Sequence, residues 1–222
     1  MVIYLIIGII AIFGIIIYLN YTLEKKRTEG LQRVATQLGM NFSAGDIGLI
    51  PNLTSTGEFS LLSQGHSQKI KNVMSGIRQD IDTTIFDYSY VTGHGKNRHT
   101  HQQTVLALKL NKSFLPKFSL KPENIFHKVG TMFGYQDIDF ENHPAFSSKY
   151  LLRGVDETAI RSLFTDSVIA FYESETGFCT EVEINQILFY RPGVRVKPEN
   201  IRPFLDKGLK LLAILPPIAT SV

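Results

Sequence analysis

VIYLIIGIIAIFGIIIYL, residues 2–19, carries no charged side chain, and it decides how this chain is built. Asn20 and Tyr21 follow it, and the first basic residues come soon after them. An α-helix rises about 1.5 Å per residue, so this stretch is just long enough to cross a hydrocarbon core of about 30 Å. We therefore expect residues 1–21 to form a transmembrane helix.

A cleaved signal peptide is the alternative interpretation of this stretch. Such a peptide begins with basic residues, has a shorter apolar region and ends in a small-residue cleavage site. Here Met1 to Ile3 carry no side-chain charge, and the stretch ends in Tyr18-Leu19-Asn20-Tyr21 rather than an Ala-x-Ala pattern. These features favour an anchor that stays in the membrane.

Basic residues after the apolar stretch indicate the orientation of the anchor. They are Lys25, Lys26, Arg27 and Arg33. Under the positive-inside rule, this membrane-proximal basic cluster places the C-terminal part in the cytoplasm. A solvated helix face is the alternative explanation, but the position directly behind a lipid span favours the topological one. We expect a single-pass protein of the inner cell membrane.

Cysteine usage and net charge narrow the compartment and the partners. Cys179 is the single cysteine, so no intramolecular disulfide can form, which suits a reducing compartment. The formal net charge is only +3, and much of the excess lies beside the membrane. This is too little to indicate nucleic acid. The expected partners are the lipid bilayer and a protein at the membrane.

Behind the anchor, residues 22–40 are expected to continue as an amphipathic helix. Leu31, Val34, Ala35 and Leu38 fall on one face, and Gly39 is placed to end the helix. Residues 46–56 are rich in Gly, Pro, Asn and Ser/Thr, and this composition predicts a loop.

The rest of the chain alternates strand-like and helix-like segments. Segments rich in β-branched and aromatic residues predict strands at 69–76, 81–92, 103–110, 150–153, 178–184 and 186–191. Apolar residues at helical spacing predict helices at 123–133, 156–172 (broken near Thr165-Asp166) and 199–215. The expected fold class is α+β, with an antiparallel sheet and covering helices.

A repeated pentapeptide suggests an internal duplication. Lys121-Pro122-Glu123-Asn124-Ile125 recurs as residues 197–201, and a weaker likeness joins Phe59-Ser60 to Phe146-Ser147. Coincidence between two ordinary helix starts is the alternative. The duplication hypothesis divides the soluble part into two strand–strand–helix units, residues 41–140 and 141–222.

The predicted hairpin at residues 93–101 is the most suggestive candidate for a binding site. Its basic and imidazole side chains are His94, Lys96, Arg98, His99 and His101. Gly95-Lys96 does not match a P-loop, because the spacing differs and a strand rather than a helix follows. A basic tip near an anionic leaflet suits lipid headgroups, whereas a solvated loop is the ordinary alternative. The histidines also suggest a metal site, although no carboxylate lies within the hairpin.

Acidic residues alternate with apolar ones after residue 136. In an extended segment, Asp137, Asp139 and Glu141 would share one face and Ile138 and Phe140 the other. This acidic face suits a divalent cation or acid–base chemistry. The alternative is an amphipathic edge segment with a solvated side.

Signatures of a nucleophile, a dinucleotide site or a phosphate loop are absent from the sequence. There is no Gly-x-Ser-x-Gly, and Cys179 lies in an apolar strand context typical of an inert buried thiol. We expect no cofactor.

The middle of the chain resembles a group of uncharacterised bacterial proteins with one N-terminal span and a cytoplasmic domain. The residues that carry this resemblance are Phe86–Lys96, Gln103–Val105, Leu115–Phe118, Pro122–Glu123, Gly134–Phe140, Phe146–Ser147 and Tyr150–Gly154. The resemblance implies a bacterial cell-membrane protein and brings no catalytic residues with it. The sequence thus favours a membrane-anchored binding or scaffolding module. The alternative is a membrane-tethered hydrolase or metal-dependent enzyme using the Asp137/Asp139 segment and the hairpin histidines.

Overall fold

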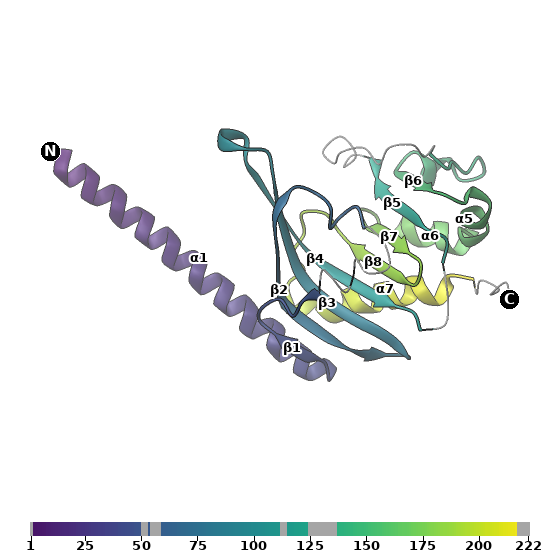
Figure 1. The fold of residues 1–222 in the computed structure, drawn as a ribbon, viewed down its shortest axis with the longest axis horizontal. Helices are drawn as coiled ribbons and strands as arrows, with labels where there is room; N and C mark the ends of the chain where they lie inside the picture. The colour runs from purple at the N-terminus through teal and green to yellow at the C-terminus, as the bar shows by residue number, and fades with distance from the viewer. Residues whose placement is uncertain (1, 50–52, 54–58, 112–114, 124–136, 217–222) are drawn as a thin grey trace.

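A computed structural model describes residues 2–49, 53, 59–111, 115–123 and 137–216. A single long helix, α1 (Val2–Leu38), runs through both the expected span and the expected juxtamembrane helix. It ends as predicted at Gly39, which has a positive φ of 61°. The apolar residues from Tyr4 to Leu19 are 48 to 81% exposed. Figure 1 shows this N-terminal half projecting away from the rest of the molecule.

Further along α1, the helix packs on the folded domain. Leu31 and Ala35 are fully buried, and Val34 and Leu38 pack against the same core. Among the described residues, α1 is the one helix long and apolar enough to cross a membrane. The helix therefore changes from an exposed apolar part to a part that packs on the domain, while the lipid contact of the first part stays a prediction.

Eight strands of the described chain form one antiparallel sheet in the order β1-β2-β3-β4-β8-β7-β5-β6. The strands are β1 (Asn41–Ser43), β2 (His66–Arg78), β3 (Ile81–Thr92), β4 (His99–Lys109), β5 (Phe118–Pro122), β6 (Tyr150–Gly154), β7 (Cys179–Glu183) and β8 (Gln186–Tyr190). The expected α+β fold is confirmed. The short strands β1 and β5 are the two that we did not predict.

The predicted hairpin joins β3 and β4, whose register runs from Asp82↔Lys109 to Thr92↔His99. Its tip contains a short 3-10 turn, η1 (Gly95–Asn97). Gly93 enters this tip with a φ of +72°, and a Cβ there would lie 2.1 Å from the Asn97 carbonyl oxygen. Glycine is therefore required at this point. In Figure 1 the hairpin extends well beyond the rest of the sheet.

Helices cover one side of the sheet, which we call the helix face. They are α4 (Pro144–Ser147), α5 (Glu157–Leu163), α6 (Asp166–Ser174) and α7 (Ile201–Ile214), the last preceded by the 3-10 turn η2 (Pro198–Asn200), with the C-terminal part of α1 packed beside them. The predicted break near Thr165-Asp166 separates α5 from α6, and the Asp156 side chain caps α5 through the Ala159 amide at 2.9 Å.

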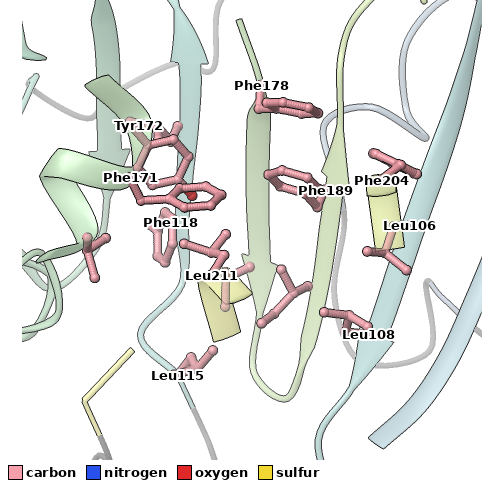
Figure 2. Close-up of a cluster of buried hydrophobic side chains, with 14 of the residues drawn as sticks. Leu106, Leu108, Leu115, Phe118, Phe171, Tyr172, Phe178, Phe189, Phe204 and Leu211 are labelled. Atoms are coloured by element: carbon pink, nitrogen blue, oxygen red, sulfur yellow. The ribbon is translucent and has the colours of Figure 1, made fainter. Parts of the chain in front are cut away.

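The core of the helix face is aromatic. Figure 2 shows Phe171 and Tyr172 of α6, Phe204 of α7 and Phe189 of β8 converging on it. Phe178 and Phe189 stack with ring centroids 4.4 Å apart. At Gly208 a Cβ would lie 2.2 Å from Leu106 Cδ2, so α7 approaches β4 closely. Burying each such large apolar side chain contributes roughly 1.5–3 kcal/mol.

The opposite side of the sheet, which we call the loop face, is covered by the connection between β1 and β2. Phe86, Val105 and Leu188 point to this side, while their neighbours Ile85, Leu106 and Phe189 point to the helix face. The covering residues are Leu49, Leu53, Phe59, Leu61 and Leu62, all buried. A loop was predicted for residues 46–56, which is wrong at Leu49 and Leu53, where the backbone is helical. The apolar side chains of these two residues pack on the loop face of the sheet. The composition of the segment does not reveal this packing.

Two sequence hypotheses stay predictions. The predicted helix at 123–133 lies, apart from Glu123, outside the described residues. Residues 197–201 open α7 through η2, whereas Lys121 and Pro122 end β5. Strands from both proposed units share the one sheet, with β5 lying between β7 and β6. The duplication and the unit boundary at 140/141 are not tested by this arrangement.

Candidate functional site: a cleft beside the anchor helix

A cleft of about 650 Å³ lies between α1 and the strands β2, β3 and β4. On the α1 side its wall is formed by Asn20, Leu23 and Glu24, which directly follow the apolar stretch. On the sheet side, Arg98 at the hairpin belongs to the same wall. The cleft therefore lies where the chain leaves the expected lipid layer.

The charged side chains that line the cleft are mainly basic. Four are cations and two are carboxylates, so the lining has an excess of two positive charges: Lys69, Lys71, Arg98, Arg195, Glu24 and Asp87. Lys69, Lys71 and Arg98 are exposed. Lys69 and Lys71 lie two apart on β2 and thus on one face of the strand.

At the floor of the cleft, Asp87 of β3 binds Arg27 of α1 through two hydrogen bonds. Arg27 Nε donates to Asp87 Oδ2 at 2.8 Å, and Nη2 donates to Oδ1 at 2.6 Å. Arg27 Nη1 also donates to the Val196 carbonyl oxygen at 2.8 Å. This paired geometry is the strong form of an arginine–carboxylate contact, and it fixes α1 against the sheet.

Arg195, in the segment before η2, joins α1 to the same carboxylate. Its guanidinium donates to both oxygens of Glu24, at 2.5 and 2.9 Å, and lies 3.4 Å from Asp87 Oδ2. Thr104 Oγ1 donates to Asp87 Oδ1 at 2.9 Å. Three distant segments of the chain therefore meet at one buried acid.

Asn72 completes the cluster from a bulge in β2. The register of β2 against β3 shifts between Lys71 and Met74, and Asn72 adopts a φ of +53° there. Asparagine tolerates this left-handed conformation better than most residues. Its buried side-chain amide donates to Asp87 Oδ2 at 2.8 Å.

The surroundings of Asp87 keep it ionised. Burial by itself would raise the pKa of this carboxyl, but the hydrogen bonds and positive charges of Arg27 and Arg195, with the Asn72 amide, outweigh burial and lower the pKa. The pKa of Glu24 is lowered mainly by its hydrogen bonds from Arg195. With Arg27, which pairs with Asp87 but does not line the cleft, the charges of Arg27, Arg195, Asp87 and Glu24 sum to zero. The three cations Lys69, Lys71 and Arg98 then remain without a carboxylate partner in this group.

The predicted membrane-proximal basic cluster divides in two. Lys25, Lys26 and Arg33 are exposed on α1. The Arg27 side chain is only 12% exposed and pairs with Asp87. Arg27 thus differs from its neighbours because it faces the sheet, and its charge is already neutralised within the chain.

The hairpin residues do not form one site. Arg98 lines the cleft, and Lys96 and His99 are exposed. His94 stacks on His66 with ring centroids 5.1 Å apart. His101 stacks on Tyr90 at 4.7 Å and accompanies it on the loop face. Within the described part of the chain, no group of three or more His, Cys, Asp or Glu side chains is arranged to bind a metal ion.

The acidic segment lies at the other end of the sheet. Asp137, Asp139 and Glu141 are exposed, but their segment is not a strand. The Asp137 carboxylate accepts from the Leu152 amide of β6 at 2.9 Å, and the Asp139 carbonyl accepts from Arg161 at 2.8 Å. Because β6 is the edge strand farthest from β2 in the sheet order, the structure does not bring this segment to the hairpin.

Several cleft residues were not identified from the sequence: Asp87, Arg195, Lys69, Lys71 and Glu24. Asp87 had a detectable signal, since it is a lone acid within the otherwise uncharged Ile85-Phe86-Asp87-Tyr88-Ser89-Tyr90. An acid at a buried strand position requires a partner. The sequence does not show that the partner is on α1.

Comparisons with known proteins support the fold. No family model matches the sequence, and no curated protein matches it. Among solved structures, the chain is similar to the crystal structure of the mycobacterial trehalose monomycolate transport factor A, TtfA. The TM-score is 0.61 at 16% identity, and the match covers 87% of this chain and 98% of that chain. The neighbour is a bacterial protein, as the sequence resemblance implied, and at this identity the likeness concerns the fold.

Proposed function

We propose that this chain is a single-pass membrane-anchored module whose cleft beside α1 binds the anionic headgroups of lipids at the cytoplasmic surface. The observation that carries the proposal is the position of the cleft. Asn20, which follows the apolar stretch directly, lines it together with Arg98 of the hairpin. The cleft therefore lies at the depth expected of the headgroup layer.

Three further observations support this proposal. The exposed apolar surface of α1 from Tyr4 to Leu19 needs an apolar environment, and a bilayer supplies one. The free charge of the cleft is positive, as attraction to an anionic leaflet requires. The similar fold belongs to a transport factor for trehalose monomycolate, which favours a lipid-related accessory role for this chain. The basic cluster behind the span favours the cytoplasmic side.

A membrane-tethered enzyme is less well supported. It requires the Asp137/Asp139 segment and the hairpin histidines to act together, and these lie at different ends of the sheet. His101 and Arg98 also point to opposite faces of the hairpin. We therefore propose binding rather than catalysis at the hairpin.

The test is a titration of the full chain in maltoside micelles with short-chain lipids, followed by calorimetry. Dihexanoyl phosphatidylglycerol should bind, whereas dihexanoyl phosphatidylcholine should not. The triple variant K69Q/K71Q/R98Q should bind on the order of a hundredfold more weakly, because each cation near the headgroup contributes about 1 kcal/mol. Glycerol phosphate is the comparison ligand without acyl chains. Binding weaker than that of dihexanoyl phosphatidylglycerol indicates a lipid site, and equal binding indicates a general phosphate site.

The matched control is K109Q/K149Q/K210Q. It removes the same number of positive charges at exposed positions outside the cleft. This control should bind phosphatidylglycerol as the wild type does. An equal loss of phosphatidylglycerol binding in both triple variants would show a non-specific charge effect and contradict the proposal. Unaltered binding in K69Q/K71Q/R98Q would also contradict it.

A further inference from the structure

A second cavity, of about 210 Å³, lies on the loop face of the sheet. It is separate from the cleft, because adjacent residues of β4 line the two: Gln102 lines the cleft, and Gln103 lines the cavity. The cavity wall includes Leu61, Tyr90, Gln103, Lys121, Cys179 and Tyr190. Its volume is about that of seven liquid water molecules, which suits a small molecule rather than a lipid.

Gln103 presents a hydrogen-bond donor that is not used by the described chain. The residue is 1% exposed, and its Nε2 has no hydrogen-bond partner among the described residues. Its Oε1 accepts from the Gly193 amide at 3.4 Å, so the orientation of the side-chain amide is fixed. An unpaired buried amide costs about 1–3 kcal/mol, which a ligand with an acceptor oxygen would recover.

Lys121 supplies a second donor in the same wall. Its ammonium group donates to Ser60 Oγ and lies 3.4 Å from Glu181 Oε1. An ammonium group has three donors, and these two contacts account for two of them. The cavity therefore offers donors from two sides, which selects a ligand that accepts hydrogen bonds.

The positive charge of Lys121 in the wall is balanced by Glu181, which pairs with it but does not itself line the cavity. Burial opposes ionisation of Glu181, but the charge of Lys121 and the hydrogen bonds from Tyr190, Leu61 and Ser60 outweigh it and lower the pKa of this carboxyl. The ionised Glu181 thus balances Lys121, and a ligand with a full negative charge would be repelled by Glu181. An uncharged ligand meets no such repulsion.

Apolar and aromatic side chains form much of the remaining wall, which also includes Gln64 and His101. Leu61 is 2% exposed, and the Tyr90 and Tyr190 rings offer flat surfaces for a ligand. Cys179 is fully buried, and burial raises the pKa of its thiol, so it contributes packing rather than a reactive thiolate.

We propose that this cavity binds a small uncharged molecule with a carbonyl oxygen and an apolar body, the carbonyl accepting from Gln103 Nε2 and the Lys121 ammonium. The site is independent of the headgroup cleft. It would make the loop face a sensor or carrier surface for such a molecule on the side of the sheet away from the helices.

The test uses benzamide, benzoate and ethylbenzene with the full chain in maltoside micelles, measured by saturation-transfer NMR against empty micelles. Benzamide should bind, benzoate should bind more weakly because of Glu181, and ethylbenzene should bind more weakly because it lacks an acceptor. Chains with ¹⁵N-labelled glutamine should show a shift of the Gln103 side-chain amide when benzamide is added.

The variants are Q103M, which keeps the length of the side chain and removes the donor, and Q102M, its neighbour facing the cleft. Q103M should bind benzamide about tenfold more weakly, as loss of one buried hydrogen bond predicts. Q102M should bind as the wild type does. Q103M also removes Oε1, so the Gly193 amide loses its acceptor, and we expect a loss of about 1 kcal/mol in the free energy of unfolding.

Several outcomes overturn the proposal. Absence of benzamide binding to the wild type is one, and equal binding to wild type and Q103M is another. If Q103M were poorly folded, the ¹⁵N shift in the wild type decides: an unshifted Gln103 amide at saturating benzamide excludes the site. Lipid binding to the cleft is measured with other ligands and variants, so the two proposals fail separately.

Discussion

Two buried carboxylates, one on each face of the sheet, are stabilised in different ways. Asp87 on the helix face binds two arginines that come from α1 and from the segment before α7. Glu181 on the loop face binds Lys121 of the neighbouring strand β5, and Ser60, Tyr190 and the Leu61 amide complete its partners. The first carboxylate joins α1 to the domain at the edge of an open cleft. The second joins a covering loop to the sheet beside the small cavity of the loop face.

The exposure of the carboxylates differs as well. The Asp87 side chain is 9% exposed and that of Glu181 is 3% exposed, while their partners Arg27 and Lys121 are similarly exposed, at 12% and 10%, and Arg195 is 22% exposed. A charge that loses its partner beside an open cleft is solvated more readily than one beside a small cavity within the domain. This comparison teaches that similar ion pairs have different structural roles, one orienting the anchor and the other securing the core.

The largest expected effect is that of E181Q. Removing this negative charge leaves the Lys121 ammonium buried without its counter-ion, so we expect a loss of about 3 kcal/mol in the free energy of unfolding. Denaturant unfolding of the full chain in micelles measures it. The double variant K121M/E181Q should recover much of the loss, because no unpaired charge remains.

The matched control is E183Q in the same strand. Glu183 pairs with Lys117, whose side chain is 40% exposed and remains solvated when the carboxylate is removed. For E183Q we expect a loss of about 1 kcal/mol in the free energy of unfolding. Equal losses in E181Q and E183Q would show that burial of the cation is not the deciding difference.

D87N should lower the free energy of unfolding by about 2 kcal/mol, which is less than the loss expected for E181Q. Arg195 keeps Glu24 in this variant and lines the cleft, where water can solvate its guanidinium group. The loss should be local: hydrogen exchange should become faster in the part of α1 that packs on the domain and remain unchanged in α6. D82N, at an exposed position of the same strand, is the control and should stay within about 0.5 kcal/mol of wild type. Uniform acceleration across both helices would contradict a specific role in docking α1.

The smallest expected effect is on the acid limb of the stability curve. The pKa values of Asp87 and Glu181 are lowered in the folded chain, so the unfolded chain binds more protons as the pH falls below about 5. Stability is therefore present above the unfolded pKa and is lost as the pH falls toward the folded pKa. In D87N this limb should be shallower, by at most about 1.4 kcal/mol per pH unit.

Asp137 contributes with the opposite sign, because partial desolvation of its carboxyl group raises its pKa although the residue is exposed as a whole, and its protonation favours the folded chain. The pH dependence is measured by denaturant unfolding from pH 3 to 7 in wild type, D87N and D82N. Identical slopes in wild type and D87N would mean that Asp87 titrates alike in the folded and unfolded chain, against the ion pair with Arg27.

The local elements of the fold could be predicted because they depend on short-range patterns. The apolar stretch before Asn20, the stop at Gly39 and the glycine at the hairpin are properties of a few neighbouring residues, and all three agree with the structure. The alternation in residues 81–92 likewise gave β3 with its predicted bounds. The hairpin residues were predicted as one site, but the strand alternation divides them between two faces.

The sequence by itself determined the long apolar N-terminal helix, the α+β class and most strands and helices, since periodicity and charge act over a few residues. Only the tertiary structure decided which polar groups meet. Arg27 reaches Asp87 across a separation of 60 residues and the Val196 carbonyl across 169. Such contacts depend on sheet order and on how α1 crosses the sheet, and no local pattern encodes either, because burial energy is shared among all the packed elements.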